Sequence, residues 1–170
     1  GEKIVVDLQN AQGDQSNLKT MSQKFVNDKE DLIIAIATPA AQSVAAETQE
    51  IPILATAITD YTEAGLVESN EVPNVNLSGT SDRTPVKEQF ALLKQILPDV
   101  KKVGIMYNSS EANSEVQARA AIEACGELGL EYQEGTVTNV NDIQQVVQSI
   151  VGEVDALYIP TDNTFASAIP

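Results

Sequence analysis

A chain of 170 residues with 42% apolar residues and a formal net charge of −15 can bury a sizeable core in one or two domains. Its 10 Lys and Arg against 25 Asp and Glu argue against binding to nucleic acid or an anionic membrane surface, because both need a basic face. With no histidine and one cysteine, Cys125, the sequence excludes an internal disulfide, cysteine metal clusters and histidine-dependent triads or metal sites.

Neither a membrane span nor an export signal is recognisable within these 170 residues. No apolar run approaches the ~18 residues of a membrane span, and no signal peptide is present. Because the chain starts at Gly1 and not at Met, we expect a targeting segment to be missing from it.

Apolar runs alternate with helical patterns in the first half of the chain. The spacing of Leu18, Met21 and Phe25 predicts one helix face, and Thr38-Pro39 suits a helix start because proline fits the first helical position. The predicted elements are a strand at 3–8 (KIVVDL), a helix from Ser16, a strand at 32–37, an alanine-rich helix over 40–47 and a strand at 51–58.

The second half repeats this alternation after a less regular stretch. Residues 77–85 (LSGTSDRTP) shift in composition and are the best candidate for a link between two α/β units. The elements predicted beyond it are a helix from Val86 that stops before Pro98, a strand at 103–106, a helix over 114–128, a strand at 131–137, a helix around 143–150 that ends near Gly152 and a strand at 155–159. Cys125, inside a helical pattern, is expected to be a buried small side chain.

This order predicts an α/β fold with parallel strands joined by right-handed crossovers. We assign residues 1–79 to a first lobe and 80–170 to a second. Both sheets look incomplete, because the first would begin directly at residues 3–8 without the strand and helix that normally come before them, and the last helical turn stops at Pro170. We therefore expect the chain to be a fragment of a longer protein.

Polar loops follow several of the predicted strands. In parallel α/β sheets, ligands sit beyond the carboxyl ends of the strands, where helix N-termini favour anionic groups such as carboxylates. Helix capping explains any single Ser, Thr, Asn or Asp there, but residues 108–114 (NSSEANS) hold more such residues than one cap needs. The other loops are 10–14 (NAQGD), 37–43 (ATPAAQS), 59–61 (TDY) and 160–164 (PTDNT).

Catalytic interpretations find little support. Asp60 and Asp162 could act as an acid–base pair, but nothing in the spacing shows that they meet. Ser109 has no histidine partner, and no glycine-rich phosphate loop is present. We expect no catalytic residue, no cofactor and no metal site.

Six ordered motifs together carry a resemblance to a known family. They are NAQGD, IATPAAQ, TAITD, LSGTSD, KVGIMYNSSEANS and VDALYIPTDNT. In this order the sequence resembles the substrate-binding proteins of ABC transporters, most of all the branch whose characterised members bind aromatic amino acids such as tryptophan. The resemblance covers essentially the whole chain and is far more specific than any single motif.

The resemblance implies a type I periplasmic-binding fold, in which two Rossmann-like lobes close on a ligand by a hinge near residues 78–82. Hydroxyl and N–H groups at helix starts would hold the α-carboxylate of an amino acid, and Asp162 would hold its ammonium group. Tyr61 and Phe165 could stack on an aromatic ring, although an aliphatic ligand is also compatible. The implied ligand-binding residues are Thr38, Pro39, Ala40, Thr59, Asp60, Tyr61, Asn108, Ser109, Ser110, Asn113, Ser114 and Asp162.

By the same resemblance, the protein would be an extracytoplasmic receptor, periplasmic or anchored as a lipoprotein. It would act as a monomer and deliver its ligand to a membrane permease. Two alternatives stay open at this point: a ligand-sensing domain of a regulator with the same fold, and an α/β enzyme that uses Asp60 or Asp162 as acid or base.

Overall fold

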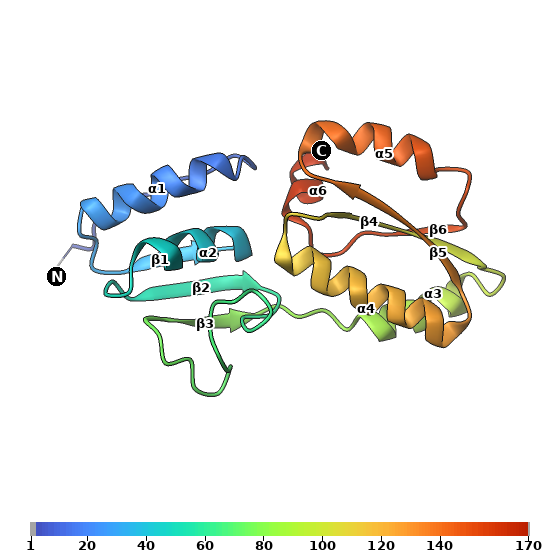
Figure 1. The fold of residues 1–170 in the computed structure, drawn as a ribbon, viewed down its shortest axis with the longest axis horizontal. Coiled ribbons are helices and arrows are strands. Elements are labelled where there is room, and N and C mark those ends of the chain that lie inside the picture. The colour runs from blue at the N-terminus through green and yellow to red at the C-terminus, as the bar shows by residue number, and fades with distance from the viewer. Residues whose placement is uncertain (1–2, 170) are drawn as a thin grey trace.

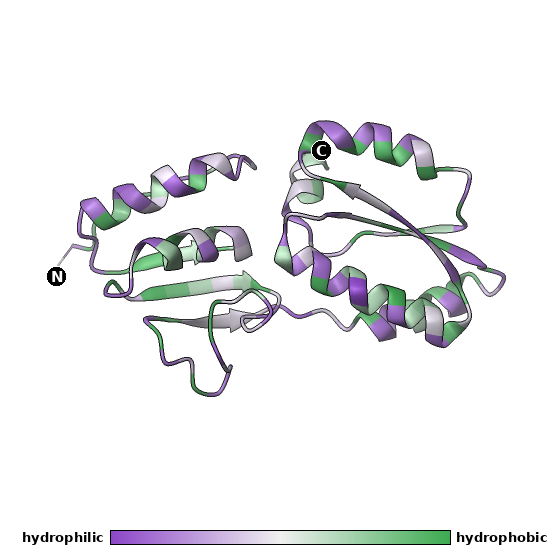
Figure 2. Cartoon of the chain, in the orientation of Figure 1, coloured by the Kyte–Doolittle hydropathy of each residue, from purple (hydrophilic) through white to green (hydrophobic). Residues whose placement is uncertain are grey.

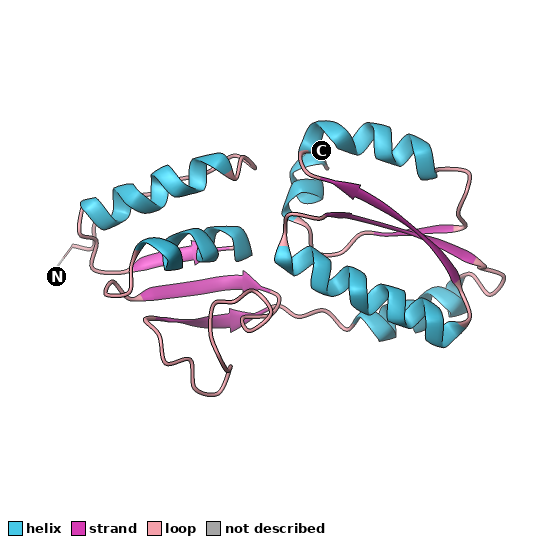
Figure 3. Cartoon of the chain, viewed as in Figure 1, coloured by secondary structure: helices cyan, strands magenta, loops and turns pink. Residues whose placement is uncertain are grey.

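Two parallel sheets organise the chain in the computed structural model, which describes residues 3–169 (Figures 1 and 3). The first sheet has the order β1-β2-β3 and the second the order β5-β4-β6, with every pairing parallel. The strands are β1 (Ile33–Ile36), β2 (Ile53–Ile58), β3 (Leu77–Ser81), β4 (Lys102–Asn108), β5 (Glu131–Val137) and β6 (Ala156–Tyr158). The fold class predicted from the sequence is thus confirmed.

Helices alternate with the strands, as the sequence pattern predicts, except between β2 and β3, where residues 59–76 form no helix. They are α1 (Ser16–Asn27), α2 (Thr38–Glu47), α3 (Val86–Ile96), α4 (Ala112–Leu128), α5 (Ile143–Ile150) and α6 (Asn163–Ala168), with a 3-10 turn, η1 (Val140–Asp142), before α5. Helices α1, α4 and α5 show purple and green bands in Figure 2, as expected for helices with one apolar face. Among residues 3–169, no helix combines the length and apolarity that a bilayer crossing demands.

The core of the first lobe lies between its sheet and α2. Ile33 and Ala35 of β1 point to this side and pack with Ala41 and Val44 of α2. The intervening residues of β1, Ile34 and Ile36, point to the opposite face and are exposed. Side chains alternate between the two faces of a strand, so only one face of this sheet is covered.

The second lobe is built around β4, which lies between β5 and β6. Val103 and Ile105 pack with α4, whereas Met106 packs on the other face with Ile150 of α5. Gly135 makes this second packing possible, because a β-carbon at that position would lie 2.3 Å from the Cδ1 atom of Ile150. Both faces of the second sheet are therefore covered by helices.

Cys125 lies in the α4 packing of the second lobe, fully buried and unpaired, as its helical context predicts. Burial raises the pKa of its thiol, which favours the uncharged form. The residue therefore acts as a small core side chain.

Two sequence predictions were wrong. Residues 3–8 form no strand, and the apolar side chains of Ile4, Val5 and Val6 are exposed, because no strand among the described residues pairs with their backbone. Residues 77–81, taken from their composition as part of the link, form β3 and pair with β2. The connection between the last strand of the first sheet and α3 is consequently limited to residues 82–85.

The predicted lobe boundary between residues 79 and 80 falls within β3, and it stays a prediction. The outer limits of the predicted lobes include residues 1, 2 and 170, which lie outside the described part of the chain.

Candidate functional site

The carboxyl ends of the strands in both sheets point toward the boundary between the lobes (Figure 1). Helices α2 and α4 begin at this boundary, so their N-termini face one another across it. The polar loops singled out in the sequence thus gather where parallel α/β folds place their ligands.

A cavity of about 520 Å³ lies at this boundary. Most of its lining comes from the first lobe, from residues 7–25 and 34–44, among them Ala37, Pro39 and Ala40 at the start of α2. The second lobe contributes Glu111, Asn163, Thr164 and Ser167. A second cavity of about 380 Å³ is likewise lined from both sides. Its lining includes Thr59, Asp82, Asn113, Thr161, Asp162 and Phe165.

The start of α2 has an unusual backbone and an unpartnered hydroxyl. Ala37 adopts φ 78° and ψ 153°, a conformation that is almost restricted to glycine. Thr38 is 1% exposed, and its Oγ1 atom has no hydrogen-bond partner. Thr38 itself lines neither cavity, whereas its neighbours Ala37 and Pro39 line the first. The first turn of α2 contains no acidic residue, so the positive end of the helix dipole is not neutralised locally.

Asn113 supplies a second unpartnered polar atom, from the start of α4. Its Nδ2 atom donates to the backbone oxygen of Thr161 at 2.8 Å, and to Glu111 Oε2 and Ser114 Oγ at 3.3 Å each. The Oδ1 atom of the same amide has no hydrogen-bond partner, even though the residue is buried, with 5% of its surface exposed. Asn113 therefore presents a free acceptor beside the second cavity.

Asp162 serves mainly as a link between two segments of the second lobe. Its Oδ1 atom accepts from the N–H of Phe165 at 2.8 Å, which caps α6, and its Oδ2 atom accepts from the N–H of Asn108 at 2.6 Å. Both oxygens of the buried carboxylate already accept a hydrogen bond from the backbone. A ligand ammonium group, the partner that the family resemblance implies, would have to share these oxygens with those two N–H groups.

The loop that follows β4 is held together largely by its own residues. Asn108 is buried; its Oδ1 atom accepts from the N–H and the hydroxyl of Ser110, and its Nδ2 atom donates to Thr164. Ser114 is fully buried at the start of α4, whereas Ser109 and Ser110 are exposed and line neither of the two cavities described above. These residues shape the loop more than they line the cleft.

Residues 59–61 at the end of β2 point in different directions. Thr59 is buried at the lobe boundary, with its Oγ1 atom 3.3 Å from that of Thr161. Tyr61 turns into the core of the first lobe, where its hydroxyl donates to the backbone oxygens of Ala55 and Thr80, and it lines neither cavity.

Asp60 accepts hydrogen bonds from Thr62 and Glu63 and pairs with Arg83. Burial alone would raise the pKa of its carboxyl, but the hydrogen bonds from Thr62 and Glu63 and the charge of Arg83 hold that pKa below the usual value. Asp60 and Asp162 thus belong to separate hydrogen-bond networks.

Two structural residues of this region were not predicted from the sequence. Glu111 is buried and accepts from the backbone N–H groups of Asn163 and Thr164, each at 3.0 Å. Gln117, also buried, reaches from α4 to the loop at Thr161. Gln117 lies in an ordinary helical pattern and Glu111 in the polar loop 108–114 before it, so only their nonlocal partners distinguish them.

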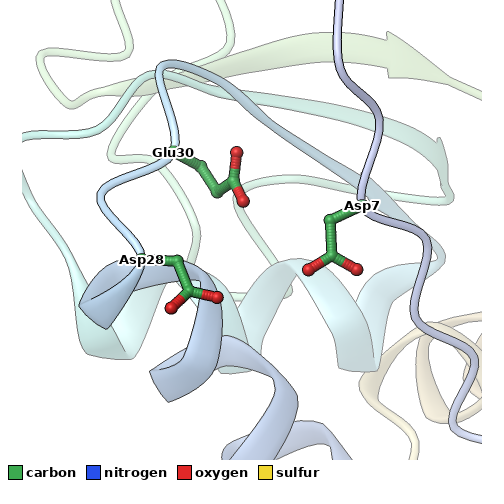
Figure 4. Close-up of side chains that lie close together, drawn as sticks. All are labelled: Asp7, Asp28 and Glu30. Carbon is green, nitrogen blue, oxygen red and sulfur yellow. The ribbon is translucent and has the colours of Figure 1, made fainter.

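An acidic cluster lies at the far end of α1 from the boundary. Asp7, Asp28 and Glu30 converge there (Figure 4). The ammonium group of Lys24 contacts both Asp7 and Asp28 and offsets part of their negative charge. These contacts raise the pKa of Lys24 and lower that of Asp7.

Two parallel α/β lobes whose strand ends face each other across a cleft define the class of type I periplasmic-binding folds. The family model described as "ABC transporter substrate binding protein" matches residues 1–170. The chain therefore belongs to this family of substrate-binding proteins.

Similar proteins include a tyrosine-binding protein from Clostridioides difficile (strain R20291), which is 42% identical over 170 residues. The match covers 100% of this chain but 49% of that protein, so the chain spans about half the length of this relative.

Two solved structures are similar over nearly all of the chain. An ABC domain from Streptococcus pneumonia in complex with L-Trp shares 37% identity and a TM-score of 0.93, covering 98% of this chain and 59% of its own. The ligand-free, open structure of a substrate-binding protein with adhesive properties from Clostridium difficile is 46% identical, with a TM-score of 0.61. That match covers 99% of this chain and 57% of the other chain. The present chain thus matches the ligand-bound structure more closely in shape, although it is more similar in sequence to the open one.

Proposed function

We propose that this protein is the solute-binding component of an ABC transporter and that it captures a zwitterionic amino acid between its two lobes. The observation that carries the proposal is the pair of buried, unpartnered polar atoms at the lobe boundary, Thr38 Oγ1 and Asn113 Oδ1. Leaving such an atom unpaired costs about 1–3 kcal/mol, so each one calls for an explanation. An amino acid bound between the lobes would supply it, with one end at the start of α2 beside the first cavity and the other at Asn113 beside the second.

The two helix starts suit opposite ends of an amino acid. The start of α2 is free of acidic residues and carries the Thr38 hydroxyl, so it suits the α-carboxylate. The start of α4 has Glu115 in its first turn, follows Glu111 and offers the acceptor Asn113 Oδ1, so it suits the ammonium group. This orientation assigns the carboxylate to one helix start, that of α2, and it differs from the expectation drawn from the resemblance in giving the ammonium group to Asn113 and not to Asp162.

An aromatic side chain is the ligand class that the relatives favour. One relative is a tyrosine-binding protein and another was solved with L-Trp. In this chain Phe165 lines the second cavity and offers an aromatic ring for contact with a ligand ring, whereas Tyr61 does not. L-tyrosine and L-tryptophan are therefore the first ligands to test.

Ligand capture would proceed by rotation of the lobes about residues 82–85, as in other two-lobed receptors. The better match to the L-Trp complex than to the open, ligand-free relative supports such a closure. The receptor would work outside the cytoplasm and pass its ligand to the permease of the transporter, as its family membership suggests.

Isothermal titration of the full-length protein with each of the twenty amino acids tests the ligand class. We expect heat with L-tyrosine or L-tryptophan and none with acidic amino acids. Absence of heat with every aromatic amino acid would contradict the aromatic assignment.

Thr38→Val tests the site itself, because it removes the hydroxyl and keeps the shape of the side chain. We expect affinity to fall about tenfold through the loss of one hydrogen bond to a charged group, and the melting temperature of the ligand-free protein to rise, since a buried unpaired hydroxyl is removed. Thr20→Val, at an exposed position of α1, is the matched control. Unchanged affinity in Thr38→Val would rule out the proposed carboxylate site.

A further inference from the structure

Gln117 bonds through both ends of its side-chain amide. Its Nε2 atom donates to Thr161 Oγ1 at 2.6 Å and to the backbone oxygen of Asn113 at 3.0 Å. Its Oε1 atom accepts from Thr84 Oγ1 at 2.9 Å and from the N–H of Thr161 at 3.3 Å. The residue is buried, so these bonds form where water does not compete.

Thr161 is consequently held at all three of its polar atoms by one face of α4. Gln117 binds its hydroxyl and its N–H, and Asn113, one helical turn earlier, binds its backbone oxygen at 2.8 Å. The position of Thr161 also decides which way the Asn113 amide points. A flipped amide would place Oδ1 against the backbone oxygen of Thr161 and against Glu111 Oε2, both of which are acceptors.

The same network reaches the first lobe and the connection between the lobes. Thr59 Oγ1, at the end of β2, lies 3.3 Å from Thr161 Oγ1 and 3.5 Å from Gln117 Nε2. Thr84 lies in the connection at 82–85. Opening the lobes separates Thr59 from Thr161 and Gln117, whereas the shorter bonds within the second lobe can persist.

We propose that Gln117 is a positioning residue that couples lobe closure to the ligand acceptor of the second lobe. Through Thr161 it keeps Asn113 Oδ1 facing the cleft, and through Thr59 and Thr84 it favours the arrangement in which the lobes are closed. This inference rests on the proposed function, because it assigns a role to Gln117 in holding an amino acid at that site.

Gln117→Met in the full-length protein is the direct test, because it removes both hydrogen-bonding ends of the side chain at similar volume. The probes are L-tyrosine and L-tryptophan, followed by stopped-flow fluorescence, together with small-angle scattering of the ligand-saturated protein. We expect dissociation to become about tenfold faster, association to change less than about threefold, and the saturated protein to be more extended. Gln148→Met, at an exposed position of α5, is the matched control and should behave like wild type.

The outcomes separate this inference from the proposed function. If wild type binds neither amino acid, the proposed function fails. If wild type binds and Gln117→Met shows the dissociation rate and shape of the control, the role of Gln117 fails alone. A purely structural role would lower the melting temperature and leave the dissociation rate of the folded fraction unchanged.

Thr59→Val supports the test if Gln117→Met does not fold. It removes only the hydroxyl on the first-lobe side of the network and leaves every Gln117 bond within the second lobe in place. We expect dissociation to become about threefold faster, in keeping with the long distances of these contacts. A dissociation rate equal to that of wild type would contradict the coupling between the lobes.

Discussion

The two lobes follow the same α/β plan but cover their sheets differently. In the first lobe α2 packs on one face of the sheet, and Ile34 and Ile36 on the other face are exposed. In the second lobe α4 packs against Ile105 on one face and α5 against Met106 on the other. A parallel sheet covered on both faces is the usual arrangement, so the second lobe has the more complete packing.

This difference bears on where binding residues can be held in place. The buried polar network of Glu111, Asn113 and Gln117 lies in the second lobe, at and just before the start of α4, which packs in one of the two cores of that lobe. At the boundary, the first lobe contributes the start of α2 and Thr59. A site keeps its geometry best when rigid elements support it, so we expect the second lobe to hold its part of the site more firmly.

The largest expected effect is loss of packing in the second sheet. Ile105→Ala, at a position that is 0% exposed, should lower the free energy of unfolding by about 3 kcal/mol. Ile36→Ala, the same change at a 63% exposed position of the first sheet, should cost less than about 0.5 kcal/mol. Urea unfolding of both variants measures the contrast, and equal losses would remove the difference between the lobes.

A smaller effect is expected from the polar network of the second lobe. Glu111→Gln replaces one acceptor oxygen by a donor that faces the donors of Asn163 and Thr164, and it should destabilise the protein by about 2 kcal/mol. Glu115→Gln, exposed on the first turn of α4, should be nearly neutral. Thermal unfolding compares the two variants. If Glu111→Gln lost no more stability than Glu115→Gln, the buried polar network would contribute little to the stability of the protein.

The smallest effect is expected in the first lobe and depends on pH. Because the folded-state pKa of Asp60 is lowered, its charged form stabilises the fold above the unfolded-state pKa of about 3.9, and this contribution is lost as pH falls through the folded-state value. Asp60→Asn should therefore cost about 1 kcal/mol at pH 7, and its difference from wild type should shrink below about pH 4. Urea unfolding across pH 3–7, with the exposed Asp31→Asn as control, measures it; a difference independent of pH would contradict the assignment.

Local patterns predicted the elements that depend on local signals. Proline at the start of α2, helical spacing in α3 and Gly129 after α4 set boundaries close to those observed. Residues 3–8 were mispredicted because a strand requires a paired neighbour, which composition does not reveal. Residues 77–81 were mispredicted for the opposite reason, since their polar composition hid a strand that pairs with β2.

The sequence predicted the location of the candidate site better than it predicted the contacts of the residues there. Thr38 and Asn113 were singled out as residues at helix starts, and the structure leaves one polar atom of each without a partner. Tyr61, in the same kind of loop, turns into the core because its hydroxyl finds acceptors between β2 and β3. Hydrogen-bond partners far apart in sequence decide such outcomes, and no spacing rule encodes them.

The first turn of α2 contains no acidic residue, in a chain that is otherwise strongly acidic, and this contrast affects which solutes can approach it. At a net charge of −15, the surface repels anions that come within the screening length, about 8 Å at physiological ionic strength. A neutral zwitterion meets no such repulsion and still finds a local positive end for its carboxylate, whereas a dicarboxylic amino acid is repelled on approach. We therefore expect the charge distribution of this chain to slow the association of acidic solutes relative to neutral ones.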